Sequence, residues 1–275
     1  MTKYLQMNVK SLLTNPYLIF WSILFIEFWV FMWVFVFGGD LLLIDEAMRM
    51  EAVRLYMASA YGNLLILSLS GACVTIGSSI LYSSRSIRFV TKYTRLSPAR
   101  FLFENLASSL VALLVVSTIM LLSIMAVFYS RFALFIVPVN PAGLAGSLLL
   151  STLFIYALSL FLNLLIVTLK APKSANFISF LPLIFGFISY SALWIDFKAA
   201  VYVSPFNCIT SICYFAASGE IPPAGNFFAP RSSQTLVDVN LVLISLLAWI
   251  AVLIAIDVLL LRKMRGVGVE EIRTT

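Results

Sequence analysis

Charged residues are scarce in this sequence, and histidine is absent. Only 11% of its 275 residues are Asp, Glu, Lys or Arg, and there is no His. So few charges cannot cover the surface of a soluble protein of this length. Without His, the chain lacks the commonest metal ligand and the side chain best suited to carrying protons near neutral pH. Metal transport and metalloenzyme chemistry inside the membrane are therefore disfavoured.

Other absences narrow the class of protein further. The cysteines Cys73, Cys208 and Cys213 form neither an even set for disulfides nor a metal-ligand spacing, so we expect packing residues. No Gly-x-x-x-x-Gly-Lys-Ser/Thr motif occurs, so we expect no P-loop binding of ATP. No acid, base and nucleophile are clustered as in an enzyme. The sequence therefore predicts no catalytic residue, cofactor or metal on this chain.

Long apolar runs dominate what is present. Hydrophobic residues make up 62% of the chain, and the mean hydropathy is +1.04. The runs exceed the roughly 10 residues of a barrel strand and do not alternate with polar residues, so the spans are helical. The first run is followed by no small-residue cleavage site and is read as a retained span. We predict an all-α integral membrane protein, one transmembrane domain over residues 1–275, with six spans at about 17–37, 60–82, 102–128, 143–169, 176–195 and 239–261.

Shorter helices are expected between and beside the spans. Residues 1–16 and residues 40–58 have the spacing of amphipathic helices in the membrane interface, the second on the outer side. Small residues in the second span, Gly71 among them, would let another helix approach closely. Pro182 and Gly186 are expected to break the fifth span.

The segment after the fifth span resembles a helix that does not cross the membrane. Ser204-Pro205 suits the N-cap and first residue of a helix, and Gly219 suits its end. A helix of that length reaches about 21 Å, less than the roughly 30 Å hydrocarbon core. We expect a re-entrant or interfacial helix on the outer side.

A basic stretch lies between the second and third spans. Over residues 84–97, four cations fall within roughly 80° of helix circumference, which predicts a short amphipathic helix; they are Arg85, Arg88, Lys92 and Arg95. Ser97-Pro98 ends it and starts the next helix. With both termini cytoplasmic, 13 Lys and Arg residues lie inside and 5 outside, which favours this orientation for a multi-pass protein of the cell membrane.

The layout resembles the membrane subunit of type-2 ATP-binding-cassette (ABC) exporters. The most specific parts are Leu96-Ser97-Pro98-Ala99-Arg100-Phe101 before the third span and Ser204-Pro205-Phe206 before the re-entrant segment. The stretch from Ser83 to Phe103 has no acid and no Gly, whereas the family's loop often carries acids and a Gly-Thr pair. The subfamily is therefore left open.

This resemblance implies a permease that works as a dimer, with a second copy or a homologous permease. Two separate ABC ATPase subunits would carry ATP and Mg, and residues 84–97 would be the coupling helix that docks on them. Spans one, two and five would line the path of a hydrophobic or amphiphilic substrate. The candidate path residues are Phe25, Glu27, Trp29, Trp33, Ser68, Thr75 and Phe185.

Other interpretations stay open beside these. The basic stretch also suits binding to anionic lipid head groups, and both roles are compatible. Glu27 suits either a path-lining or dimer-interface role or ordinary polar packing. Asp257 is explained by pairing with Arg262 and Lys263 or by snorkelling. An ATP-independent secondary carrier or channel is the alternative function, and the positive charge requires no nucleic acid.

Overall fold

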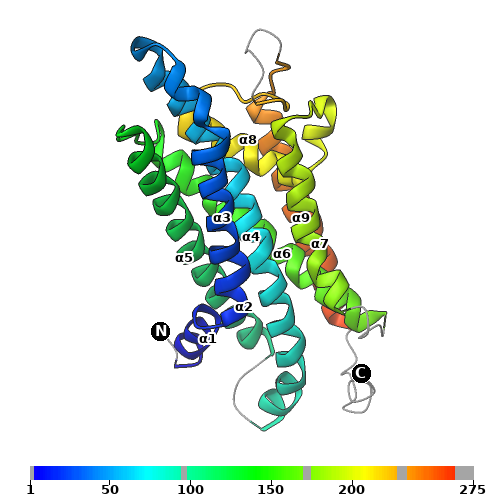
Figure 1. Ribbon diagram of the computed structural model, residues 1–275. Coiled ribbons are helices and arrows are strands. Elements are labelled where there is room, and N and C mark those ends of the chain that lie inside the picture. The colour runs from blue at the N-terminus through cyan, green and yellow to red at the C-terminus, as the bar shows by residue number, and fades with distance from the viewer. Residues whose placement is uncertain (1–2, 94–97, 170–174, 228–233, 264–275) are drawn as a thin grey trace.

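The computed structural model describes residues 3–93, 98–169, 175–227 and 234–263, and these form an all-helical bundle without strands (Figure 1). The main helices are α1 (Lys3–Leu13), α2 (Pro16–Ile19), α3 (Phe25–Phe31), α4 (Glu46–Tyr93), α5 (Pro98–Phe132), α6 (Pro141–Thr168), α7 (Ala175–Tyr190), α8 (Pro205–Ser218) and α9 (Val239–Lys263). Two π-helical segments, η1 (Phe20–Leu24) and η2 (Met32–Phe37), continue α2 and α3. Shorter 3₁₀ turns are η3 (Gly39–Leu43), η5 (Ser191–Leu193) and η6 (Lys198–Tyr202).

Successive long helices run in opposite directions. α1, the end of α4 and the end of α9 lie at the lower end of the bundle in Figure 1, while α8 lies at the upper end. Two hydrogen bonds tie the loop before α6 to α8, from the Val139 and Asn140 amides to the Ala217 and Ala216 carbonyls, at 2.9 and 3.0 Å. Asn140 also caps α6, because its side chain accepts the Gly143 amide at 2.8 Å.

Five helical stretches among the described residues are long and apolar enough to cross a membrane: Pro16–Phe37, Met48–Ile76, Phe103–Phe132, Pro141–Thr168 and Val239–Leu260. They correspond to five of the six predicted spans, and a multi-pass membrane protein follows from them. The stretch matching the predicted span at 176–195 is shorter, Phe177–Leu193. Its helix α7 is not broken, because it continues through Pro182 and Gly186.

One helix replaces three predicted ones. The expected outer interfacial helix at 40–58, the second span and the start of the basic stretch merge into α4, which runs without interruption for 48 residues. The helix-compatible residues that join the three patterns contain no Pro and only isolated Gly, so nothing in them forces an end. The predicted amphipathic helix at the N-terminus is confirmed as α1, which buries Leu12 and leaves Met7 and Lys10 exposed.

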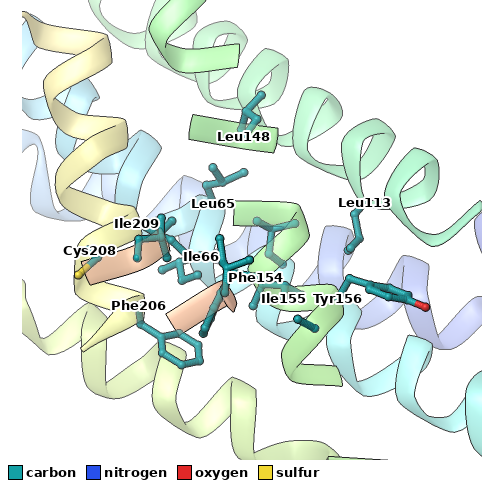
Figure 2. Close-up of a cluster of buried hydrophobic side chains, with 14 of the residues drawn as sticks. Leu65, Ile66, Leu113, Leu148, Phe154, Ile155, Tyr156, Phe206, Cys208 and Ile209 are labelled. Carbon is teal, nitrogen blue, oxygen red and sulfur yellow. The ribbon is translucent and has the colours of Figure 1, made fainter. Parts of the chain in front are cut away.

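α4 is the centre of the bundle. Of its most apolar stretch 94% is buried, against 22% for α9, and α5, α6, α7 and α8 all pack on it. Side chains from α4, α6 and α8 meet in a buried cluster that includes Leu65, Ile66, Phe154, Phe206 and Ile209 (Figure 2). Burial of apolar area does not drive association inside lipid, so this packing is stabilised mainly by close contact and polar bonds.

Small residues on α4 permit that contact. A Cβ atom on Gly62 would lie 2.6 Å from the Thr210 carbonyl oxygen of α8, and one on Gly71 would collide with the Trp21 carbonyl oxygen of η1. Beside Gly71, the Ser68 hydroxyl donates to the Ser22 carbonyl at 2.6 Å. The expected close approach to the second span is thus confirmed, and the backbones it brings together are those of η1 and α8.

α8 is the predicted short helix, with the predicted ends. Ser204 accepts the Asn207 amide at 3.4 Å, Pro205 is the first helical residue, and Gly219 ends the helix with φ +76°. Nearly all of α8 is buried, against α4, α6 and α9. α8 therefore lies inside the protein, in contact with three helices, and not on its surface.

The loops beside α8 are joined through Asp196. Its carboxylate accepts the Thr235 hydroxyl at 2.6 Å and the Lys198 amide at 2.8 Å, and an isolated bridge pairs Asp196 with Gly225. The Thr235 hydrogen bond, followed by the Lys198 amide, lowers the pKa of Asp196 below its ordinary value. These contacts connect the end of α7 to the start of α9.

Replacing Gly71 by alanine is expected to destabilise the protein. The new Cβ has no room beside the Trp21 carbonyl oxygen, so α4 and η1 must separate. Overpacking of this kind costs about 1–3 kcal/mol. Thermal unfolding of the purified protein in detergent measures the effect. Gly146→Ala on α6 is the matched control, because apart from its own stretch of helix nothing lies within 4 Å of its Cβ position. Equal losses in both variants would contradict the close-approach argument.

Candidate translocation path

Aromatic side chains form a continuous row between the first and fifth predicted spans. Across this seam, ring centroids lie 5.3 Å apart for Trp21–Phe180, 6.2 Å for Phe25–Phe187, 5.9 Å for Trp29–Phe187, 5.6 Å for Trp29–Tyr190 and 5.8 Å for Trp33–Tyr190. All five pairs are edge-on, the geometry that the charge distribution of aromatic rings favours. We call these residues, Trp21, Phe25, Trp29, Trp33, Phe180, Phe187 and Tyr190, the aromatic seam.

The π-helical segments explain how four seam residues stay on one side. Trp21, Phe25, Trp29 and Trp33 are spaced by four, and an α-helix has 3.6 residues per turn, so such a row drifts by about 40° per step. A π-helical turn closes i→i+5 hydrogen bonds and holds more than four residues. A step of four residues therefore falls short of a full turn there, and the row drifts in the opposite direction. Alternation of η1, α3 and η2 therefore keeps these residues facing α7.

Three of the predicted path residues, Phe25, Trp29 and Trp33, belong to this seam. Trp33 is fully buried, and its carbonyl accepts the Tyr56 hydroxyl at 2.7 Å. In the single subunit these side chains pack two helices together. The opposite side of the first span exposes a different set of apolar residues: Phe20, Leu24, Phe28, Phe31 and Phe35.

The other predicted path residues lie apart from the seam. Glu27 is half-buried and accepts the Ser123 hydroxyl of α5 at 2.6 Å. Ser68 and Thr75 are buried within α4, and Ser68 bonds to the backbone of η1. Phe185 is 46% exposed, and its ring centroid lies 5.9 Å from that of Phe206 on α8. The seven residues therefore occupy several distinct environments instead of one continuous wall.

The predicted coupling residues fall at the edge of what the structure describes. Arg85, Arg88 and Lys92 belong to α4, whose helical backbone reaches Tyr93, but their side chains lie outside the described part. Arg95 lies outside the described residues altogether. The C-terminal part of α4 extends past α1 at the lower end of the bundle (Figure 1).

Sequence reasoning missed the partners that α7 contributes. Phe180, Phe187 and Tyr190 occur in an apolar run, where aromatics are common and lipid contact is the usual interpretation. The four-residue spacing from Trp21 to Trp33 was the one sequence pattern that indicated an aromatic row. This spacing does not stay on one face of a regular α-helix, and the π-helical segments that keep the row on one side have no sequence signature. The three cysteines are free and buried, as expected of packing residues.

Comparisons with known proteins add no family: no protein-family model, no curated protein and no solved structure matches this chain.

Substitution of Tyr190 tests the seam. Tyr190→Ala removes ring contacts to Trp29, Trp33 and Phe187 and is expected to lower stability by about 3–5 kcal/mol. Tyr190→Phe keeps the ring and deletes a buried hydroxyl that has no hydrogen-bond partner among the described residues, so its stability stays within about 1 kcal/mol of wild type. Thermal unfolding in detergent distinguishes them. If Tyr190→Phe loses as much as Tyr190→Ala, ring packing is not what the seam contributes.

Proposed function

We propose that this protein is the permease subunit of an ABC exporter of the type-2 class. Two such subunits form a path for a hydrophobic or amphiphilic substrate across the cell membrane. Two separate ATPase subunits, which carry ATP and Mg, drive the movement. Both termini lie on the cytoplasmic side, and the chain itself performs no catalysis.

The observation that carries this proposal is the continuity of α4. It extends 11 residues past the predicted end of the second span at Tyr82, which corresponds to about 16 Å of helix. A head-group layer is only about 5–8 Å thick on each side. A basic residue near this end such as Lys92 thus has the reach to meet a protein in the cytoplasm, which supports a docking role beside contact with lipid head groups.

The same helix has the contacts that transmission requires. α4 packs on α5, α6, α7 and α8 and, through Gly71 and Ser68, on η1. Displacement of its cytoplasmic end would be felt by each of these elements. A buried α8 at the opposite end supports the comparison with exporters that have a re-entrant element after the fifth span.

We assign α7 with η5 as the sixth membrane-crossing element. The apolar stretch Phe177–Leu193 has 17 residues, the lower limit for a span, and covers about 26 Å. Such a stretch is accommodated by local thinning of the bilayer or by snorkelling side chains. When this element is added to the five long stretches, the chain crosses the membrane six times. An even number of crossings is required if both termini lie on the same side.

Charge reversal on the basic stretch tests the coupling role. Arg88→Glu combined with Arg95→Glu is expected to abolish co-purification with a co-expressed candidate ABC ATPase, or to leave its ATP turnover independent of the permease. Repulsion replaces attraction at the proposed docking surface. The control is Arg131→Glu with Lys198→Glu, the same charge change on exposed residues at the other end of the bundle. Unchanged binding and turnover in the first variant would refute the coupling role.

Glu27→Gln tests the path. Gln retains an oxygen that can accept the Ser123 hydroxyl, so the fold is expected to persist while the charge is lost. A path role predicts an altered set of compounds that stimulate ATP turnover of the purified complex. Glu51→Gln is the control, because Glu51 is exposed and its ion pair in the described part of the chain is the one with Arg54, at 3.6 Å. An unaltered compound profile would leave Glu27 a packing residue.

Transport without ATP distinguishes the alternative function. Purified chain in liposomes, with no ATPase and no ATP, is expected to be inactive. Net substrate movement under these conditions would establish an ATP-independent carrier or channel instead.

A further inference from the structure

A cavity of about 200 Å³ lies between α5, α6 and α9, away from the aromatic seam. Its wall is almost entirely hydrocarbon, with Leu106 of α5, Leu160 of α6 and Ile254 of α9 among the lining residues. Two side chains with polar atoms also line it, Tyr156 of α6 and Asp257 of α9. Tyr156 points away from the rest of the buried cluster around Phe154 (Figure 2).

Asp257 is deeply buried at this cavity. Only 3% of it is exposed, and its Oδ1 atom has no hydrogen-bond partner among the described residues. Glu27, a half-buried acid in the first span, by contrast accepts a hydrogen bond from the Ser123 hydroxyl. The side chains of Arg262 and Lys263, the partners expected from the sequence, lie outside the described part. A buried carboxylate oxygen without a hydrogen-bond partner is costly, so a positively charged ligand beside it would stabilise the carboxylate.

The chemistry of the wall restricts that ligand. Mg²⁺ and Ca²⁺ take at least six oxygen ligands, and this cavity offers one carboxylate, so a divalent metal ion is not suited to it. A water molecule needs two to four polar partners, which hydrocarbon walls do not supply. An organic ammonium suits both the single carboxylate and the hydrocarbon wall. Its charge pairs with Asp257, its carbon atoms contact the apolar wall, and the Tyr156 ring attracts a cation.

The size and position of the cavity favour an amphiphile. An apolar cavity of about 150 Å³ holds benzene, so this one suits a single ring or short chain beside the ammonium. Lining residues Phe103 and Val258 are 67% and 44% exposed on the outside of the bundle, so the cavity opens there. Asp257 lies six residues before the end of α9 at Lys263, about 9 Å along the helix. That depth is near the zone where amphiphiles place their charged groups.

We propose that this cavity binds the ammonium group and the adjoining hydrocarbon of a cationic amphiphile, which enters from the surrounding bilayer. Asp257 provides the counter-charge, and the helices α5, α6 and α9 provide the apolar wall. This binding is independent of the exporter function proposed above, because it requires neither an ATPase nor a second subunit.

The test uses a 3-phenylpropylamine probe that carries a photoreactive diazirine, and its alcohol analogue as a neutral match. Full-length protein in lipid nanodiscs is labelled over a range of probe concentrations, and labelled peptides are identified by mass spectrometry. The amine is expected to label the segments that line the cavity in α5, α6 and α9 saturably. The amine should reach half-maximal labelling at a concentration about 10-fold or more below that of the alcohol. The reason is that the alcohol cannot form the charge-assisted hydrogen bond to Asp257.

Matched variants assign the preference to Asp257. Asp257→Asn keeps the shape of the side chain and should raise the half-maximal amine concentration to that of the alcohol. Asp238→Asn makes the same change on an exposed residue at the other end of α9, where Asn can still accept the Asn240 amide, and should leave amine labelling unchanged. Equal labelling of wild type by amine and alcohol, or undiminished amine labelling of Asp257→Asn, would overturn the proposal. The wild-type comparison decides even if a variant fails to fold.

Discussion

The burial of α4 on every side between Met57 and Ile76 is the constraint on which the rest of the fold depends. Because lipid tails are as apolar as leucine, helices associate in a membrane only where backbones come close or polar groups bond. α4 supplies both: Gly62 and Gly71 admit the backbones of α8 and η1, and Ser68 donates to a carbonyl of η1. The positions of α8 and of the first span are therefore set by small residues on one central helix, and not by large apolar ones.

The sequence predicted those parts of the fold that local rules determine. Hydropathy located five long apolar helices, and the Ser204-Pro205 and Gly219 signals gave the ends of α8. The sequence-based prediction divided α4 into three helices, because the changes in polarity between residues 40 and 93 resemble helix boundaries. The backbone itself continues through these changes as one helix. The prediction also included a break at Pro182, but surrounding protein holds α7 helical through that residue.

The candidate path was predicted less well, for a physical reason. Phe25, Trp29 and Trp33 were identified by their type and span, yet their actual partners are fixed by the two π-helical segments and by the rotation of α7. Such geometry follows from tertiary packing and has no local pattern. Asp257 shows the same limit: the sequence places it near the end of its span, but its burial at a cavity between α5, α6 and α9 depends on helices that are distant in the sequence.

The contacts of the first span with α4 and with α7 differ in how they respond to movement. Between η1 and α4, a backbone-to-backbone approach at Gly71 and a hydrogen bond from Ser68 leave no room for sliding. Across the aromatic seam, by contrast, contact is made by ring edges at centroid distances of 5.3 to 6.2 Å, and favourable ring geometries span about 4.5–7 Å. If a partner moves the end of α4, the first span is thus expected to follow α4, and the seam with α7 is where the resulting displacement is taken up.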